Sequence, residues 1–95
     1  MLRIIETPKD ASTVELKLEG EIVSEWITLL RQQCEASLRE GRKIALDFSE
    51  VRFVDCRAVD MLTTLDRERI RIIRCPQFIE DMINECRRLD EAPDQ

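Results

Sequence analysis

Hydrophobic and polar residues alternate strictly along residues 13–19. This period of two predicts a β-strand with one buried face and one solvated face, and Gly20 is predicted to end it. A shorter apolar run over residues 2–6 predicts a preceding strand. The turn-like residues 7–10 between the two runs favour an antiparallel pair.

Apolar residues at three- and four-residue steps predict three amphipathic helices. The first spans about 16 residues, with Ser24 as its N-cap and Gly41 as its stop. Asp55 is the best N-cap for the second helix, and Pro76 suits the first position of the third. The apolar positions of the three helices are Ile27, Leu30, Cys34 and Leu38; Ala58, Met61, Leu62 and Leu65; and Phe78, Ile79, Met82, Ile83, Cys86 and Leu89.

Two further apolar segments predict strands. Residues 44–46 are apolar without alternation, as in a strand buried on both faces, and residues 50–55 are expected to form a loop. Residues 70–74 carry two arginines, which suit an edge strand. The order β-β-α-β-α-β-α predicts an α/β fold: a single mixed sheet of about four strands, with helices packed mainly on one face. We expect one domain over residues 1–89 and a flexible acidic tail over residues 90–95.

Composition excludes several classes of function. The 95-residue chain has no histidine, so it lacks the usual proton shuttle and nucleophile partner, and no catalytic residue is assigned. A net charge of -5 without a basic run argues against nucleic acid as a partner. No apolar stretch approaches the roughly 18 residues of a membrane span, and the first ten residues lack the apolar run of a signal peptide. We therefore expect a cytoplasmic protein without direct membrane insertion.

Four cysteines lie at positions 34, 56, 75 and 86, and no two of them form a Cys-x-x-Cys pair. This spacing predicts neither a metal site nor a cofactor. In a reducing cytoplasm the simplest interpretation is four free thiols. Most of them should be small core residues.

The candidate site is predicted at the carboxyl end of the sheet, where α/β proteins bind ligands and partners. The segment from Asp47 to Arg57 leaves a buried strand there and leads into the second helix. The start of the first helix should lie at the same end. The candidate partner-binding residues are Ser49, Asp55, Cys56, Arg57, Asp60 and Trp26.

Three segments resemble the STAS family, the anti-sigma-factor antagonists and their relatives. Residues 46–55, Leu-Asp-Phe-Ser-Glu-Val-Arg-Phe-Val-Asp, are similar to the family's buried strand, its Asp-Leu-Ser and its short loop ending in Asp. Residues 18–22 (Leu-Glu-Gly-Glu-Ile) and 75–78 (Cys-Pro-Gln-Phe) match as well. The resemblance implies a STAS-type fold and an activity of protein recognition.

In that family, as the resemblance implies, a serine or threonine just after the Asp is phosphorylated by a partner kinase that is also an anti-sigma factor. The phosphate adds about two negative charges and breaks the complex. Here Cys56 and Arg57 occupy the acceptor positions, so no phospho-acceptor is assigned. The nearest hydroxyl, that of Ser49, is interpreted as shaping the loop.

Each candidate residue also has a structural interpretation. Asp55 is either only the cap of the second helix or also part of a partner surface. Arg57 either faces an acidic partner or pairs with Asp60 or Asp55. Cys56 is either a buried or half-buried small residue or, at a helix start beside an arginine, a reactive thiol, although the neighbouring Asp55 works against a thiolate. Trp26 either packs on the core or joins the binding surface.

Two functions of different classes follow from the resemblance. The first is a non-enzymatic module that binds a partner of the anti-sigma factor or serine kinase type through residues 49–57. The alternative is a STAS-type accessory subunit that docks on the ATPase of a bacterial ABC lipid-transport complex. Nucleotide binding at the start of the second helix and a homodimer through the last strand are further options.

Overall fold

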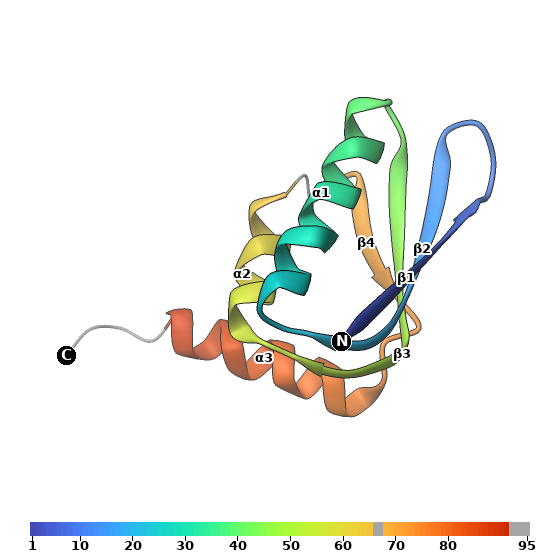
Figure 1. Cartoon of the computed structure of the whole chain (residues 1–95). Coiled ribbons are helices and arrows are strands. Elements are labelled where there is room, and N and C mark those ends of the chain that lie inside the picture. Colours follow the sequence, from blue (N-terminus) through green and yellow to red (C-terminus); the bar gives the residue numbers. More distant parts are fainter. Residues whose placement is uncertain (66–67, 92–95) are drawn as a thin grey trace.

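Four strands form one mixed sheet in the order β1-β2-β3-β4 in the computed structural model, which describes residues 1–65 and 68–91 (Figure 1). β1 pairs antiparallel with β2, and β3 lies parallel to both β2 and β4. This arrangement confirms the predicted mixed sheet. The strands are β1 (Leu2–Pro8), β2 (Thr13–Ile22), β3 (Lys43–Val54) and β4 (Ile70–Ile73).

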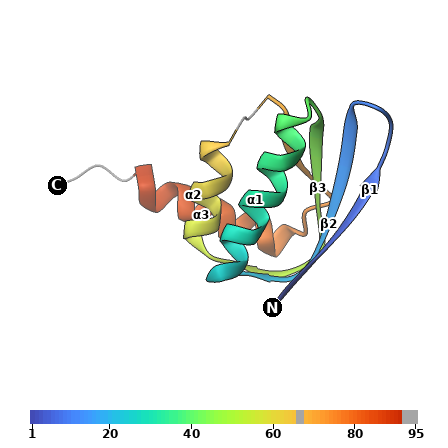
Figure 2. The ribbon, with the colours of Figure 1, turned by 45° about the horizontal axis from the view of Figure 1, so that its top comes forward.

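Three helices cover one face of the sheet, as predicted (Figures 1 and 2). In order they are α1 (Glu25–Arg39), α2 (Cys56–Thr64) and α3 (Gln77–Glu91). The core lies between them and the sheet, and its largest fully buried side chains are aliphatic apart from Phe48 and Cys34. They include Leu16, Leu18, Ile22, Leu30, Ile44, Leu46, Ile79 and Val14.

The pairing of β2 with β3 places the apolar side chains of both strands on the same face of the sheet. Val14 pairs with Ile44 and Leu16 with Leu46, so the apolar residues of both strands face the helices together. Burying a side chain of this size contributes roughly 1.5–3 kcal/mol. The one-sided pattern therefore sets which face of the sheet the helices cover.

Gly20 does not end β2, which continues to Ile22. Its φ of +115° lies in the region that favours glycine, and a Cβ at this position would lie 2.3 Å from the carbonyl oxygen of Met1. That same oxygen accepts a hydrogen bond from the amide of Glu21 at 3.0 Å. Gly20 therefore lets the beginning of β1 approach β2 closely, which is why it is needed inside the strand.

The predicted loop over residues 50–55 is wrong, because β3 extends as a strand to Val54. Its register on β2 shifts twice, once between Asp47 and Glu50 and once between Val51 and Phe53. Each shift gives β3 one residue more than β2, as in a β-bulge. The extra residues interrupt the alternation of buried and exposed positions, so the pattern does not look like a strand.

The helices begin and end near the residues that the sequence predicts, but the predicted cap Ser24 does not make the expected hydrogen bond. Ser24 is the N-cap of α1, but its φ is +52° and its side chain makes no capping hydrogen bond. Gly41, with φ +81°, follows Glu40 at the end of α1, as expected of a helix stop. Pro76 precedes α3 by one residue, and its carbonyl accepts hydrogen bonds from the third helix's first turn.

β4 is an edge strand, as predicted, and pairing of a second copy along it stays a prediction. α3 includes the first two residues of the predicted acidic tail, and residues 92–95 lie outside the described residues. Within the described ranges, none of the helices combines the length and the apolar character that crossing a membrane requires.

Candidate functional site

The carboxyl ends of β2 and β3 curve together beneath the helices and lead into α1 and α2 (Figure 1). The amide of Asp55 donates to the carbonyl of Ile22 at 3.1 Å, which ties the two strand ends to each other. The helix starts that carry the candidate residues are thus placed side by side by the sheet. This is the position that the parallel strand order predicts for a site.

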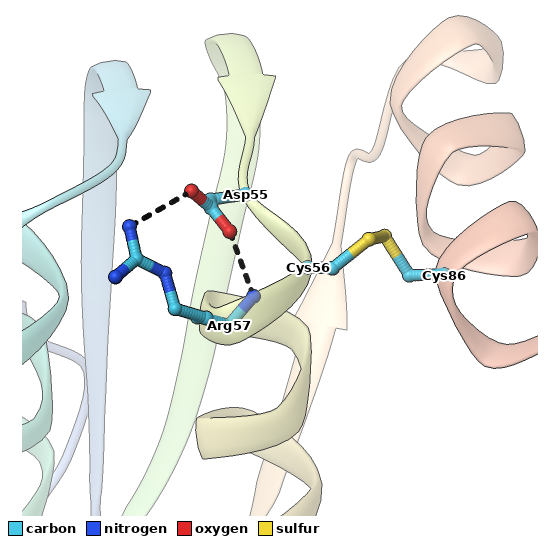
Figure 3. The surroundings of a disulfide bond; sticks show 4 residues. All are labelled: Asp55, Cys56, Arg57 and Cys86. Atoms are coloured by element: carbon cyan, nitrogen blue, oxygen red, sulfur yellow. Dashed lines mark hydrogen bonds and ion pairs between the residues drawn. A yellow bond between two sulfur atoms is a disulfide. The ribbon is translucent and has the colours of Figure 1, made fainter. Parts of the chain in front are cut away.

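Asp55 is the N-cap of α2, as predicted. One carboxylate oxygen accepts from the amide of Arg57 at 2.9 Å, and the other faces its guanidinium at 3.3 Å (Figure 3). The amide and side-chain hydrogen bonds from Arg57 lower the pKa of Asp55 below its ordinary value, against a small opposing effect of burial. Asp55 is therefore a charged cap, and its negative charge disfavours a phosphate at this helix start.

Arg57 pairs with Asp55, one of the two partners that the sequence left open, and its side chain remains 72% exposed. It lines a hollow of about 320 Å³ between α1 and α2, together with Asp60 of α2 and Arg31 of α1. Both signs of charge meet in this hollow. Such a surface suits recognition of a protein that carries both acidic and basic side chains.

The interpretation of Cys56 as a free thiol is wrong. Cys56 forms a disulfide with Cys86, and the Cα atoms are 5.3 Å apart (Figure 3). Cys56 is exposed, which contradicts its interpretation as a buried or half-buried small residue. The two cysteines are 30 positions apart in sequence, and only the packing of α3 beside α2 brings them together. Cys34, which is buried, and Cys75, which is half-buried, are free.

An apolar groove beside the disulfide was missed by the sequence analysis. The groove has a volume of about 560 Å³ and lies between the end of β3 and α3. Phe53 and Phe78 line it and are 44% and 51% exposed, and Met82 lies one helical turn beyond Phe78. The i, i+4 spacing of Phe78 and Met82 was visible in the sequence, but Phe53 fell in the expected loop.

Two predicted residues do not join Asp55, Arg57 and Asp60. Ser49 is exposed on β3, and its amide donates to Asp47 at 2.9 Å, consistent with a shaping role. The strand between Ser49 and Asp55 separates them by roughly 15–20 Å. Trp26 is half-buried against the core and lines a different hollow, between α1 and β1, with neighbours such as Leu2 and Leu29.

An ion pair between a half-exposed arginine and two largely buried carboxylates lies on the sheet face opposite the helices. Arg74, whose φ is +52°, reaches Asp47 at 3.1 Å and Glu15 at 3.4 Å. Burial alone would raise the pKa of Asp47, but hydrogen bonds from Ser49 and the charge of Arg74 outweigh it, so that pKa lies below its ordinary value. The segment around Asp47 thus has a structural role that its position in the sequence did not reveal.

Comparisons with known proteins agree with this geometry. A family model described as "Mlab, STAS domain" matches residues 5–87. No curated protein sequence matches the chain. A solved structure of the anti-sigma factor antagonist SpoIIAA in its unphosphorylated form is similar in fold, with a TM-score of 0.74. The two are 16% identical, and the similarity covers 87% of this chain and 79% of that one. The family match over most of the sequence, on a sheet of this order, shows that the chain belongs to the STAS domain family.

Proposed function

We propose that this protein is a non-enzymatic, cytoplasmic interaction module that binds a regulatory partner protein of the anti-sigma factor or serine kinase type. The binding surface is the end of β3 and the start of α2, within residues 49–57, extended by Asp60. Cys56 and Arg57 stand where the family carries its hydroxyl acceptor, so binding proceeds without the family's phospho-switch.

The observation that carries this proposal is the exposed Arg57 at the capped start of α2. A cation in the first turn of a helix is mildly unfavourable, because the helix start is itself partly positive. Asp55 offsets that cost within the protein. The guanidinium remains 72% exposed beside Asp60, where it is available to a partner's carboxylate.

A second candidate places the same surface on the ATPase of a bacterial ABC lipid-transport complex. Small stand-alone STAS proteins resemble the accessory subunit of that transporter, and the matching family model is described as "Mlab, STAS domain". Both candidates use residues 49–57 for a protein contact. They differ in the partner, which the following experiment identifies.

The test places a photo-activated cross-linking amino acid at position 28 or at position 17. Thr28 is exposed and lines the same hollow as Arg57 and Asp60, so both of these residues are retained. Lys17 lies on the strand face opposite the helices and serves as the matched control. In cells of the source organism, we expect a protein cross-linked at position 28 and none at position 17. A kinase or an ATPase in that adduct decides between the two candidates. Cross-linking at position 17 alone, or at neither position, contradicts the proposal.

The same experiment tests the missing phospho-switch. The cross-linked partner is purified and incubated with the unmodified protein and ATP, and the intact mass of the protein is measured. We expect no phosphorylated species, because neither position that follows Asp55 carries a hydroxyl. A phosphate mapped to Ser49 would overturn this part of the proposal.

A further inference from the structure

The disulfide lies at the proposed binding surface. Cys56 is the first residue of α2, between the cap Asp55 and the exposed Arg57. Figure 3 shows the bond leaving α2 toward α3 on the side away from the Arg57 side chain. A covalent link at this place couples the position of α3 to the start of the helix that carries the surface.

The two cysteines differ in exposure. Cys56 is an exposed residue, whereas Cys86 is only 6% exposed. Both cysteines line the shallow apolar groove beside Phe53 and Phe78. Cys56 is therefore the cysteine that is more open to a small thiol.

The other two cysteines are poor candidates for exchange. Burial raises the pKa of the Cys34 thiol to about 12. Burial, assisted by the charge of Glu80, also raises the pKa of Cys75. Because the thiolate is the reactive form, a raised pKa makes both thiols slow to react.

A hollow also borders the contact between α2 and α3. Val59 and Leu62 of α2 and Ile83 of α3 line this hollow of about 300 Å³, together with residues of β4. Val59 and Ile83 are themselves buried in the core. The disulfide is thus a covalent restraint added to a packed pair of helices.

We propose that Cys56 and Cys86 form a reversible thiol–disulfide exchange site for low-molecular-weight thiols and their disulfides. In oxidation, the Cys56 thiolate attacks a small disulfide R–S–S–R and releases one R–S⁻, leaving a mixed disulfide on Cys56. The Cys86 thiolate then attacks the Cys56 sulfur and releases the second R–S⁻. The protein loses two electrons and two protons, and R–S–S–R becomes two R–SH.

Reduction follows the reverse path. A small thiolate attacks the accessible Cys56 sulfur, Cys86 leaves as a thiolate and takes up a proton, and a second thiol removes the first as R–S–S–R. In a cytoplasmic protein, a disulfide is usually transient, catalytic or redox-sensing. Resting on the proposed function, we assign partner binding to the oxidised form, because the bond holds α3 beside the binding surface.

The exchange site is tested with the full chain in mixtures of reduced and oxidised glutathione. After an acid quench and alkylation, peptide masses report each cysteine. We expect Cys56 and Cys86 to change together between the thiol and the disulfide form as the glutathione ratio is varied, while the protein stays folded. We also expect alkylation of Cys56 in the reduced protein to be at least about tenfold faster than that of Cys86. A bond that opens only when the protein is unfolded with urea overturns the proposal.

Two matched variants test which sulfur is attacked. In Cys86→Ser, oxidised glutathione should accumulate as an adduct on Cys56, because the resolving thiol is absent. In Cys56→Ser, the shielded Cys86 should form little adduct under the same conditions. Equal adduct formation in the two variants overturns the assignment of Cys56 as the attacked position.

The link to partner binding is tested by repeating the cross-link at position 28 in the oxidised protein and in Cys56→Ser/Cys86→Ser. We expect at least about a threefold lower yield without the bond. Equal yields overturn the regulatory role but leave the proposed function intact. If neither form cross-links, the proposed function fails, and the glutathione titration still decides the exchange site by itself.

Discussion

At the scale of single residues, Asp47 shows how a buried carboxylate is kept charged. Its side chain is 7% exposed, and it accepts from the Ser49 amide and from Arg74. The same arginine also contacts Glu15. A buried polar group lowers the free energy of unfolding little when all its hydrogen-bond partners are present. Removing one partner lowers the free energy of unfolding by about 1–3 kcal/mol. Asp47 is therefore a sensitive position although no function is assigned to it.

We predict that Asp47→Asn lowers the free energy of unfolding at pH 7 by about 1–3 kcal/mol. Because the folded pKa of Asp47 lies below the ordinary 3.8, its stabilising effect is full above that value and is lost as the pH falls through the folded pKa. Urea unfolding from pH 7 down to pH 3 should show the difference between the two proteins shrinking. The exposed Asp81→Asn is the control, and a difference independent of pH would contradict the prediction.

At the scale of elements, the start of α2 depends on one side chain. Helix α2 is nine residues long, too short to form without tertiary contacts and a cap. Asp55 supplies the cap, and it also pairs with Arg57. The carboxylate therefore serves both the helix and the charge distribution of the proposed surface.

We predict that Asp55→Ala lowers the free energy of unfolding by about 1 kcal/mol, because the amide of Arg57 loses its acceptor. Asp55→Asn retains an acceptor oxygen and loses only an exposed ion pair, so it should cost a few tenths of a kcal/mol, roughly. Denaturant unfolding and amide exchange of α2 measure both. Equal losses in the two variants would show that charge, rather than capping, holds the helix start.

At the scale of the whole molecule, the disulfide closes a segment that contains α2, β4 and most of α3. A loop of this length reduces the entropy of the unfolded chain by an amount worth about 3–4 kcal/mol. A domain of this size has a total stability on the order of 5–15 kcal/mol. The bond is therefore a large part of the stability. Cys86 belongs to the core, but the other members of the core are joined by packing alone, so we expect the core to persist on reduction.

We predict that reduction lowers the free energy of unfolding of the whole chain by about 2–4 kcal/mol without unfolding it at 25 °C. Urea titrations with and without a strong dithiol reductant measure the difference. The double variant Cys56→Ser/Cys86→Ser should resemble the reduced protein and should not respond to reductant. An unchanged unfolding midpoint on reduction would contradict this prediction.

Much of the fold could be predicted, because local patterns repeat what the tertiary structure requires. Each of these patterns depends on residues that are close in sequence: the alternation in β2, the helical periods and the Asp55 cap. The strand at the end of β3 could not be predicted in the same way. Its two bulges exist only relative to the register of β2, and an interrupted alternation looks like a loop.

In the candidate site, too, features that depend on neighbouring residues were predicted, and features that depend on distant residues were not. Asp55 and Arg57 are neighbours in sequence, so their pairing was among the predicted options. The exposed groove and its disulfide were not, because Phe53 on β3 and Phe78 on α3 are far apart in sequence and come together only in the folded protein. Trp26 was grouped with Asp55 because both follow strand ends, but its side chain packs on the β1 side of α1.

By itself, then, the sequence determined the order of the elements, the side of the sheet that the helices cover, and the cap that starts α2. These depend on the periodicity of apolar residues and on short-range hydrogen bonds. Only the tertiary structure decided the length of β3, the apolar groove and the partner of Cys56. Those features depend on strand register and on contacts between residues about 30 positions apart in the chain. The spacing of cysteines or phenylalanines along the sequence does not tell which of them meet in the folded protein.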